Sequence, residues 1–145
     1  MKKSFYTKTL KAIENWTGEK GKEVDTSNFR YAYDLATDFE YKGAKETWNV
    51  RVDYTMHNED GSKKPVAERN MNIYLTNNVK NVEIHKSIYL YAQDDDKLYS
   101  HRAQVDVRAN SVPVAYNFVD IDLVDYDGKF ENNFDDTICG LIFRP

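Results

Sequence analysis

Apolar and polar residues alternate along residues 28–41, "NFRYAYDLATDFEY", over more positions than a usual strand contains. Successive side chains of a strand point to opposite faces, so the pattern predicts one long strand with an aromatic face. A strand of this length rarely stays straight, and a bulge or bend is expected near residues 36–38. The apolar phase consists of Phe29, Tyr31, Tyr33, Leu35, Phe39 and Tyr41, with Thr37 completing the row.

Similar alternation, broken by short polar turns, continues to the end of the chain and predicts about seven strands in all. In residues 82–92, Val82 and Ile84 share a phase with Ile88, but Lys86 interrupts that phase, which indicates either a bulge or a strand covered on both faces. The last segment, "TICGLIF", is apolar in both phases, as in a central or covered strand. The six further strands are predicted at residues 48–56, 66–76, 82–92, 98–109, 112–124 and 137–143.

Before the strands, residues 4–16 predict an amphipathic helix, because Tyr6, Leu10 and Ile13 recur at helical spacing. Gly18 follows where a helix C-terminal cap belongs, and residues 17–27 are expected to form a loop. No helical crossover separates the predicted strands, so the sheet should be mostly antiparallel. The prediction is a single mainly β domain over 1–145. Its β-rich body, 28–145, forms a small barrel or a two-sheet sandwich, with the helix packed on it.

The formal net charge is −4, which argues against general nucleic-acid binding. The distribution is uneven, because residues 1–22 carry six lysines against Glu14 and Glu19, whereas acids dominate from Asp94 to Asp136. These two regions should attract each other. The contact could lie within one molecule or run head to tail between copies, and the sequence leaves both open.

No targeting segment and no stretch of the ~20 apolar residues of a membrane span is visible, so the expectation is a protein without membrane contact. The single Cys139 cannot form an internal disulfide and fits a reducing compartment. A cytoplasmic location is therefore expected, or a virion if the chain is of phage origin.

Metal and cofactor motifs do not fit the chain. The acidic segment 120–136 fails the EF-hand template, because aligning Gly128 to its central glycine puts Leu123 and Phe134 where acids are required. A looser cation site there stays open beside the alternative of a solvated loop. No phosphate-binding glycine loop appears, and the histidines lack metal-pair spacing. No cofactor, metal or catalytic residue is therefore predicted. His101 shares the inward phase and is a candidate at the rim of a site.

Tyrosine is the most unusual component, at eleven of 145 residues. A buried hydroxyl needs a hydrogen-bond partner, so clustered tyrosines favour a cavity or an interface over a dry core. The alternative is that the rings are buried and only their hydroxyls reach the rim. The candidate ligand- or partner-binding residues are Tyr31, Tyr33, Trp48, Tyr54 and His101.

Two function classes fit these features. The first is a non-catalytic protein-binding or assembly module that contacts a protein partner or further copies, and a phage or viral particle component or accessory protein is compatible with it. The second is a carrier of a small apolar ligand inside a closed barrel. That barrel would resemble lipocalins by fold analogy only, because Glu14 and Asn15 precede Trp16 and the family's Gly-x-Trp is missing. An enzyme is less favoured, since it would need inward acids or His101 with a displaced pKa.

Overall fold

The computed structural model describes residues 3–26, 30–41, 43–55, 60, 62, 71–90, 103–119 and 132–144. Within these residues, seven strands follow a first helix along the chain and precede a second one. The helices are α1 (Lys3–Thr17) and α2 (Phe134–Phe143). The strands are β1 (Lys22–Thr26), β2 (Arg30–Tyr41), β3 (Ala44–Thr55), β4 (Met71–Asn77), β5 (Val82–Leu90), β6 (Ala103–Ala109) and β7 (Val112–Val119).

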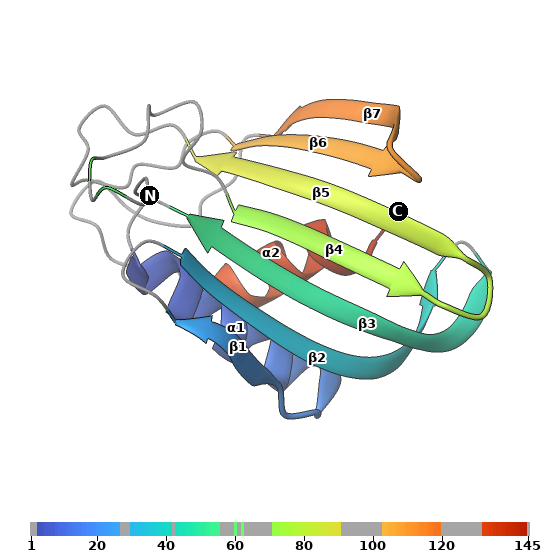
Figure 1. The fold of residues 1–145 in the computed structure, drawn as a ribbon, viewed down its shortest axis with the longest axis horizontal. Helices are drawn as coiled ribbons and strands as arrows, with labels where there is room; N and C mark the ends of the chain where they lie inside the picture. Colours follow the sequence, from blue (N-terminus) through green and yellow to red (C-terminus); the bar gives the residue numbers. More distant parts are fainter. Residues whose placement is uncertain are drawn as a thin grey trace.

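All seven strands form one antiparallel sheet in sequence order, from β1 at one edge to β7 at the other (Figure 1). The mainly β prediction with an N-terminal helix is confirmed. Within the described residues β1 and β7 do not pair with each other, so the sheet is not a closed barrel. A tight connection of this meander is the turn at Asn110 and Ser111 between β6 and β7, where both residues have positive φ.

Two expectations about the first strands need correction: the loop over residues 17–27, and the bulge that was one of two alternatives, bulge or bend, near residues 36–38. Residues 17–27 are not all loop, because Lys22–Thr26 forms β1 and pairs with the first half of β2. No bulge interrupts the β2–β3 pairing near residues 36–38, where the register is continuous along both strands. The irregularity lies instead between Glu23 and Asp25 of β1.

The predicted final strand at 137–143 is also wrong, because these residues belong to helix α2. Its buried side chains, Phe134, Ile138, Cys139, Ile142 and Phe143, recur at helical spacing. Two acidic residues, Asp135 and Asp136, stand in its first turn, where a helix favours negative charge. The helical repeat begins before the apolar run "TICGLIF" and is hidden when that run is read alone.

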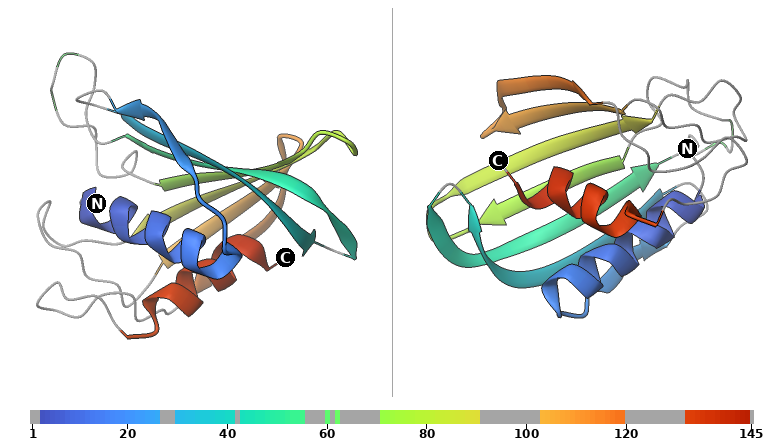
Figure 2. Two further views of the ribbon diagram at one scale, coloured as in Figure 1. Left: turned by 90° about the horizontal axis from the view of Figure 1, so that it is seen from below. Right: turned by 180° about the vertical axis from the view of Figure 1, so that it is seen from behind.

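Both helices cover the same face of the sheet and lie side by side across it (Figure 2). Phe5 of α1 packs edge-on against Phe134 of α2, with ring centroids 5.6 Å apart. Lys8 Nζ lies 3.9 Å from Asp135 Oδ1 beside this contact. One attraction between the basic N-terminal region and the acidic C-terminal region is therefore made within a single molecule.

The core lies between the helices and the sheet face that they cover. In β4 burial alternates residue by residue, with Met71, Ile73 and Leu75 fully buried and the residues between them half-buried. Leucine, isoleucine, valine and aromatic side chains dominate this layer and supply the hydrophobic stabilisation of the fold. The face turned away from the helices is here called the outer face of the sheet.

Candidate functional site

The aromatic strip of β2 and β3 lies beneath the helices. Tyr54 is fully buried, and Tyr33 and Trp48 are each 3 % exposed, whereas Tyr31 is half-buried. His101 lies outside the described residues, as does Phe29. The structure thus brings four of the five predicted site residues to one side of the sheet, where they belong to the core or border it.

Helix α1 contributes a ring to this strip. Tyr6 stacks on Tyr54 with centroids 5.9 Å apart, and its centroid lies 5.6 Å from that of Tyr31. The Tyr6 hydroxyl is buried and has no hydrogen-bond partner among the described residues. The side chain of Tyr6 occupies the space directly over Tyr31 and Tyr54, where the carrier hypothesis would place a ligand.

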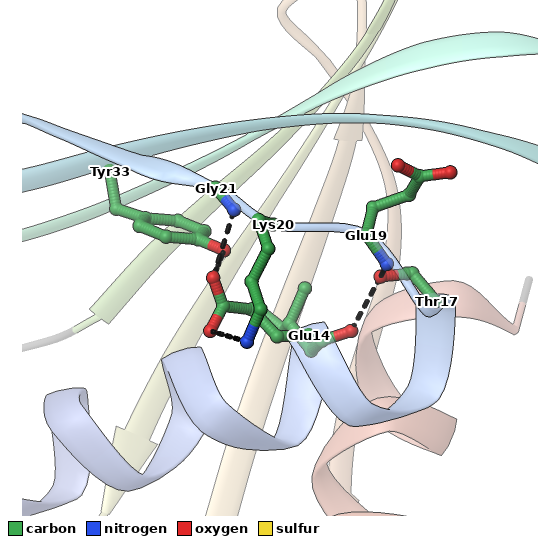
Figure 3. Close-up of polar contacts among 7 residues, drawn as sticks. Glu14, Thr17, Glu19, Lys20, Gly21 and Tyr33 are labelled. Atoms are coloured by element: carbon green, nitrogen blue, oxygen red, sulfur yellow. Dashed lines mark hydrogen bonds and ion pairs between the residues drawn. The ribbon is translucent and has the colours of Figure 1, made fainter.

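Tyr33 has a specific polar role, shown in Figure 3. Its hydroxyl donates to Glu14 Oε2 at 3.2 Å, and the Gly21 amide donates to the same oxygen at 2.9 Å. Burial, together with the nearby Glu14 carboxylate, raises the pKa of Tyr33 well above its usual value. These bonds fix the chain between α1 and β1 against β2. A side chain at Gly21 would collide with the Tyr33 ring, since an ideal Cβ lies 2.0 Å from its Cζ.

A second aromatic cluster joins the far ends of the helices to the β2–β3 hairpin. Phe39 lies between Trp48 and Phe143, with ring centroids 5.4 and 5.1 Å away. Trp16, 44 % exposed, stacks on Phe143 from the solvent side. The Trp48 indole N–H is buried and has no partner in the described part of the chain. This cluster closes the end of the core.

Lys86, the residue that breaks the phase of β5, points into the core rather than forming a bulge. The register of β5 with β4 and with β6 is regular on both sides. The Lys86 side chain is 2 % exposed, and its ammonium donates to the carbonyl oxygens of Leu141, Ile142 and Arg144 at 2.8, 2.8 and 2.7 Å. The last carbonyls of a helix have no partner within it, so this lysine caps the C-terminal end of α2.

The outer face carries the polar constellation that the sequence did not single out. One row of mutually opposite residues crosses five strands. This polar row consists of Asp34, Arg51, Tyr74, His85 and Arg108. Directly opposite residues on neighbouring strands lie close enough to interact, so the row is a chain of potential cross-strand pairs.

The first pair of the row is a two-point ion pair. Arg51 donates from Nε to Asp34 Oδ1 at 2.8 Å and from Nη2 to Asp34 Oδ2 at 2.6 Å. The hydrogen bonds from the guanidinium lower the pKa of the Asp34 carboxyl. Two parallel bonds hold the planar guanidinium in one orientation over β2 and β3.

The centre of the row is an aromatic stack. The Tyr74 and His85 rings lie 4.4 Å apart and within 11° of parallel. His85 Nε2 contacts Asn72 Oδ1 at 2.8 Å and Ser87 Oγ at 3.2 Å. The Ser87 hydroxyl donates to Asn72 Oδ1 at 2.9 Å. Burial lowers the pKa of His85, so the neutral ring is favoured.

Arg51 and Tyr74 of the polar row border an open hollow of about 340 Å³ on the outer face. It extends over three successive rows of paired residues that cross β3, β4 and β5. Arg51 and Tyr74 are the pair in the middle row. Its lining residues are Asn49, Arg51, Asp53, Tyr74, Thr76 and Glu83. A solvent-facing sheet surface is expected to be polar, and the signal that the sequence offered was a tyrosine and an arginine in the outward phase.

The described ranges contain neither a metal-binding cluster nor a membrane-spanning helix. No group of three or more His, Cys, Asp or Glu lies close enough there to hold a metal ion. Most of the acidic segment 120–136 falls outside those ranges, so its cation hypothesis is not addressed. Of the described helices, none combines the length and the apolar character that a membrane crossing requires.

Comparison with known protein families, with characterised proteins and with solved structures finds no significant match to the chain. Its function is therefore inferred from geometry alone.

Proposed function

We propose that this protein is a non-catalytic binding module whose outer-face hollow receives a cationic side chain of a protein partner. The observation that carries the proposal is the hollow itself, in which Tyr74 and Arg51 stand between carboxylates on a sheet face that neither helix covers. Tyrosine and arginine are enriched among the residues that dominate binding energy at protein interfaces.

The charge of the hollow supports a basic rather than an acidic partner. Arg51 and Asp34 neutralise each other as a pair. Asp53 and Glu83 then give the lining a net negative charge. A lysine or arginine from a partner would meet two carboxylates and the polar groups around them. Such complementarity favours encounter and selects the register of the complex.

The order of the side chains also supports a docking surface. The fork between Arg51 and Asp34, and the stack of Tyr74 on His85, fix groups that would otherwise lose rotamer freedom on binding. Ordering a long side chain at an interface costs about 0.5–1.5 kcal/mol, so a surface ordered in advance binds more tightly for the same contacts.

The carrier alternative receives less support from the packing. Its proposed lining residues Tyr54 and Trp48 are buried against other side chains, and Tyr6 of α1 covers Tyr54. A ligand between helix and sheet would have to displace α1. The setting of the module, in the cytoplasm or in a virus particle, stays part of the proposal and rests on composition alone.

Selection of a random displayed peptide library on the immobilised protein tests the proposal. The probe protein is the wild type, and the variant for counter-selection is Asp53→Asn/Glu83→Gln, which keeps shape and removes two charges from the hollow. The matched control is Glu19→Gln/Glu40→Gln, which removes two exposed charges elsewhere. We expect enriched peptides with lysine or arginine at a fixed position. The Kd of these peptides should rise about tenfold on the hollow variant, which corresponds to a loss of about 1.4 kcal/mol of binding free energy. On the control variant, the Kd should stay within about twofold of the wild-type value.

Two results would reject the proposal. One is a selection that enriches nothing beyond the bare support. The other is a set of peptides that bind the wild type and the hollow variant equally. Circular dichroism and urea midpoints of all variants establish that each retains the fold.

A further inference from the structure

The two edges of the sheet differ in a way that bears on self-association. Edge strands leave one row of backbone donors and acceptors unpaired, which makes them templates for a further strand. Here the edges are β1 and β7, at opposite ends of the sheet (Figure 1). Among the described residues, no strand pairs with the outer side of either.

Strand β1 has the features by which proteins protect an edge. It contains only five residues, and its register with β2 shifts between Glu23 and Asp25. Pairing β1 with itself about Val24 would also place Glu23 opposite Asp25, and like charges directly opposite each other are destabilising. Short length, a bulge and charge each discourage the addition of a strand.

Strand β7 lacks most of these features. It has eight residues, VPVAYNFV, with no charge and a high content of strand-favouring types. Its proline, Pro113, stands near the start of the strand, at the one register shift with β6. From Ala115 to Val119 the register with β6 is continuous, which leaves a regular outer edge.

We propose that β7 pairs antiparallel with β7 of a second copy and continues the sheet across a two-fold axis. An isologous pair places each residue opposite a residue of the same short segment, and β7 brings no charge to repel its own copy. Both partners carry an edge of equal length. Because β1 is protected and β7 is the open edge within the described part of the sheet, the pairing closes at two copies and does not propagate into a filament.

The arrangement has a consequence for binding. A two-fold axis between antiparallel strands is perpendicular to the sheet, so the outer faces of both copies look in the same direction. If the hollow binds as proposed above, two hollows on one continuous surface would bind a divalent partner with avidity. The dimer itself does not depend on what the hollows bind.

Sedimentation velocity of the full chain, from about 5 to about 500 µM, tests the dimer, since a small interface of this kind is expected to have a Kd of tens of micromolar. The mass should rise from 17.0 kDa to twice that value. Asn117→Lys and Asn117→Asp each put a charge near the middle of β7. We expect each variant alone to raise the Kd at least about tenfold, and an equimolar mixture to recover the dimer through opposite charges. Val24→Lys on β1, where Val24 is 48 % exposed, is the matched control and should leave the dimer unchanged.

A mass of 17.0 kDa at every concentration overturns the proposal, as does a dimer that neither charge variant weakens. Hydrogen exchange of the wild type provides a test that needs no variant. Backbone amides of residues 114–119 that point to the outer edge of β7 should gain protection between the dilute and the concentrated sample, while those of β1 do not. Equal exchange of β7 at both concentrations, in a sample whose mass has doubled, would place the interface elsewhere and reject the β7 pairing.

Discussion

Replacing Lys86 by methionine tests how much of the packing of α2 depends on one buried cation. Methionine keeps an unbranched, flexible stem and removes the ammonium. The three carbonyl oxygens that accept from Lys86 Nζ belong to Leu141, Ile142 and Arg144, and all three would lose that donor.

The expected loss follows from the surroundings of each carbonyl. The bond to Ile142 is buried, whereas those to Leu141 and Arg144 are partly buried, so water can reach the last two more easily. One buried acceptor without a donor costs about 1–3 kcal/mol. A cation at a partly buried helix C-terminus contributes up to about 2 kcal/mol more. The variant no longer has to bury an ammonium, which offsets part of this, so a net loss of about 2 kcal/mol is expected.

Urea unfolding and thiol labelling measure the loss independently. With a urea slope of about 2 kcal/mol/M, the midpoint should fall by about 1 M. Cys139 is fully buried on α2, and burial raises the pKa of its thiol to about 12, so it should react only when α2 opens or the protein unfolds. An opening free energy lower by about 2 kcal/mol increases the labelling rate about thirtyfold.

The matched control is Lys45→Met, because Lys45 is exposed on β3, and its effect should stay within about 0.5 kcal/mol. A Lys86→Met protein with an unchanged or higher urea midpoint and wild-type labelling of Cys139 would refute the reasoning. It would mean that water serves the α2 carbonyls as well as the ammonium does.

Three further outcomes are expected. Gly21→Ala should destabilise the protein by about 1–3 kcal/mol in urea, because its Cβ meets the Tyr33 ring, and adding Tyr33→Leu should recover part of the loss. Burial lowers the pKa of His85, so the unfolded chain binds more protons than the folded protein as pH falls through 6.5. The free energy of unfolding should therefore drop in that range, and His85→Gln should flatten its dependence on pH. Burial raises the pKa of Tyr6, Tyr33 and Tyr41, so stability should be complete below pH 10.0 and fall above it. In an absorbance titration these rings should keep their protons after exposed tyrosines have ionised.

Period-two alternation predicted six of the observed strands, β2 to β7, and missed the short β1. Alternation of this kind arises where one face of a strand meets the core and the other meets solvent. In β4, for example, Met71, Ile73 and Leu75 are buried and the residues between them are not. The seventh predicted strand failed for the opposite reason. A short segment that is apolar in every phase carries no period, and only Phe134, which precedes it, reveals the helical spacing with Ile138 and Ile142.

Lys86 shows a different limit of the sequence. Its position in the inward phase of β5 was visible, but its acceptors lie 55 to 58 residues further along the chain. They exist only after residues 134–143 become a helix that ends above β5. Predicting that segment as a strand therefore left the buried lysine without acceptors. A bulge was one of the two explanations offered for it, and the strand contains no bulge.

The hollow of the outer face could not be predicted because it depends on the pairing register of neighbouring strands. Arg51, Tyr74 and His85 belong to three strands, and their alignment depends on pairings that the alternation of each strand leaves undetermined. A sequence can place each of them in an outward phase. It cannot place them opposite one another, which is the property that makes a site.

Packing within the chain accounts for the tyrosine cluster. Clustered tyrosines were expected to meet an interface, and the surface that Tyr31, Tyr33 and Tyr54 meet is helix α1 of the same chain, through Tyr6 and Glu14. This contact joins two separate elements and gives the Tyr33 hydroxyl a partner in Glu14, as an interface between molecules would. An aromatic strip therefore indicates that something covers a strand and does not identify the covering element. Since α1 and α2 cover the aromatic strip, the two proposed contacts with other molecules lie on the face with Tyr74 and at the edge of β7.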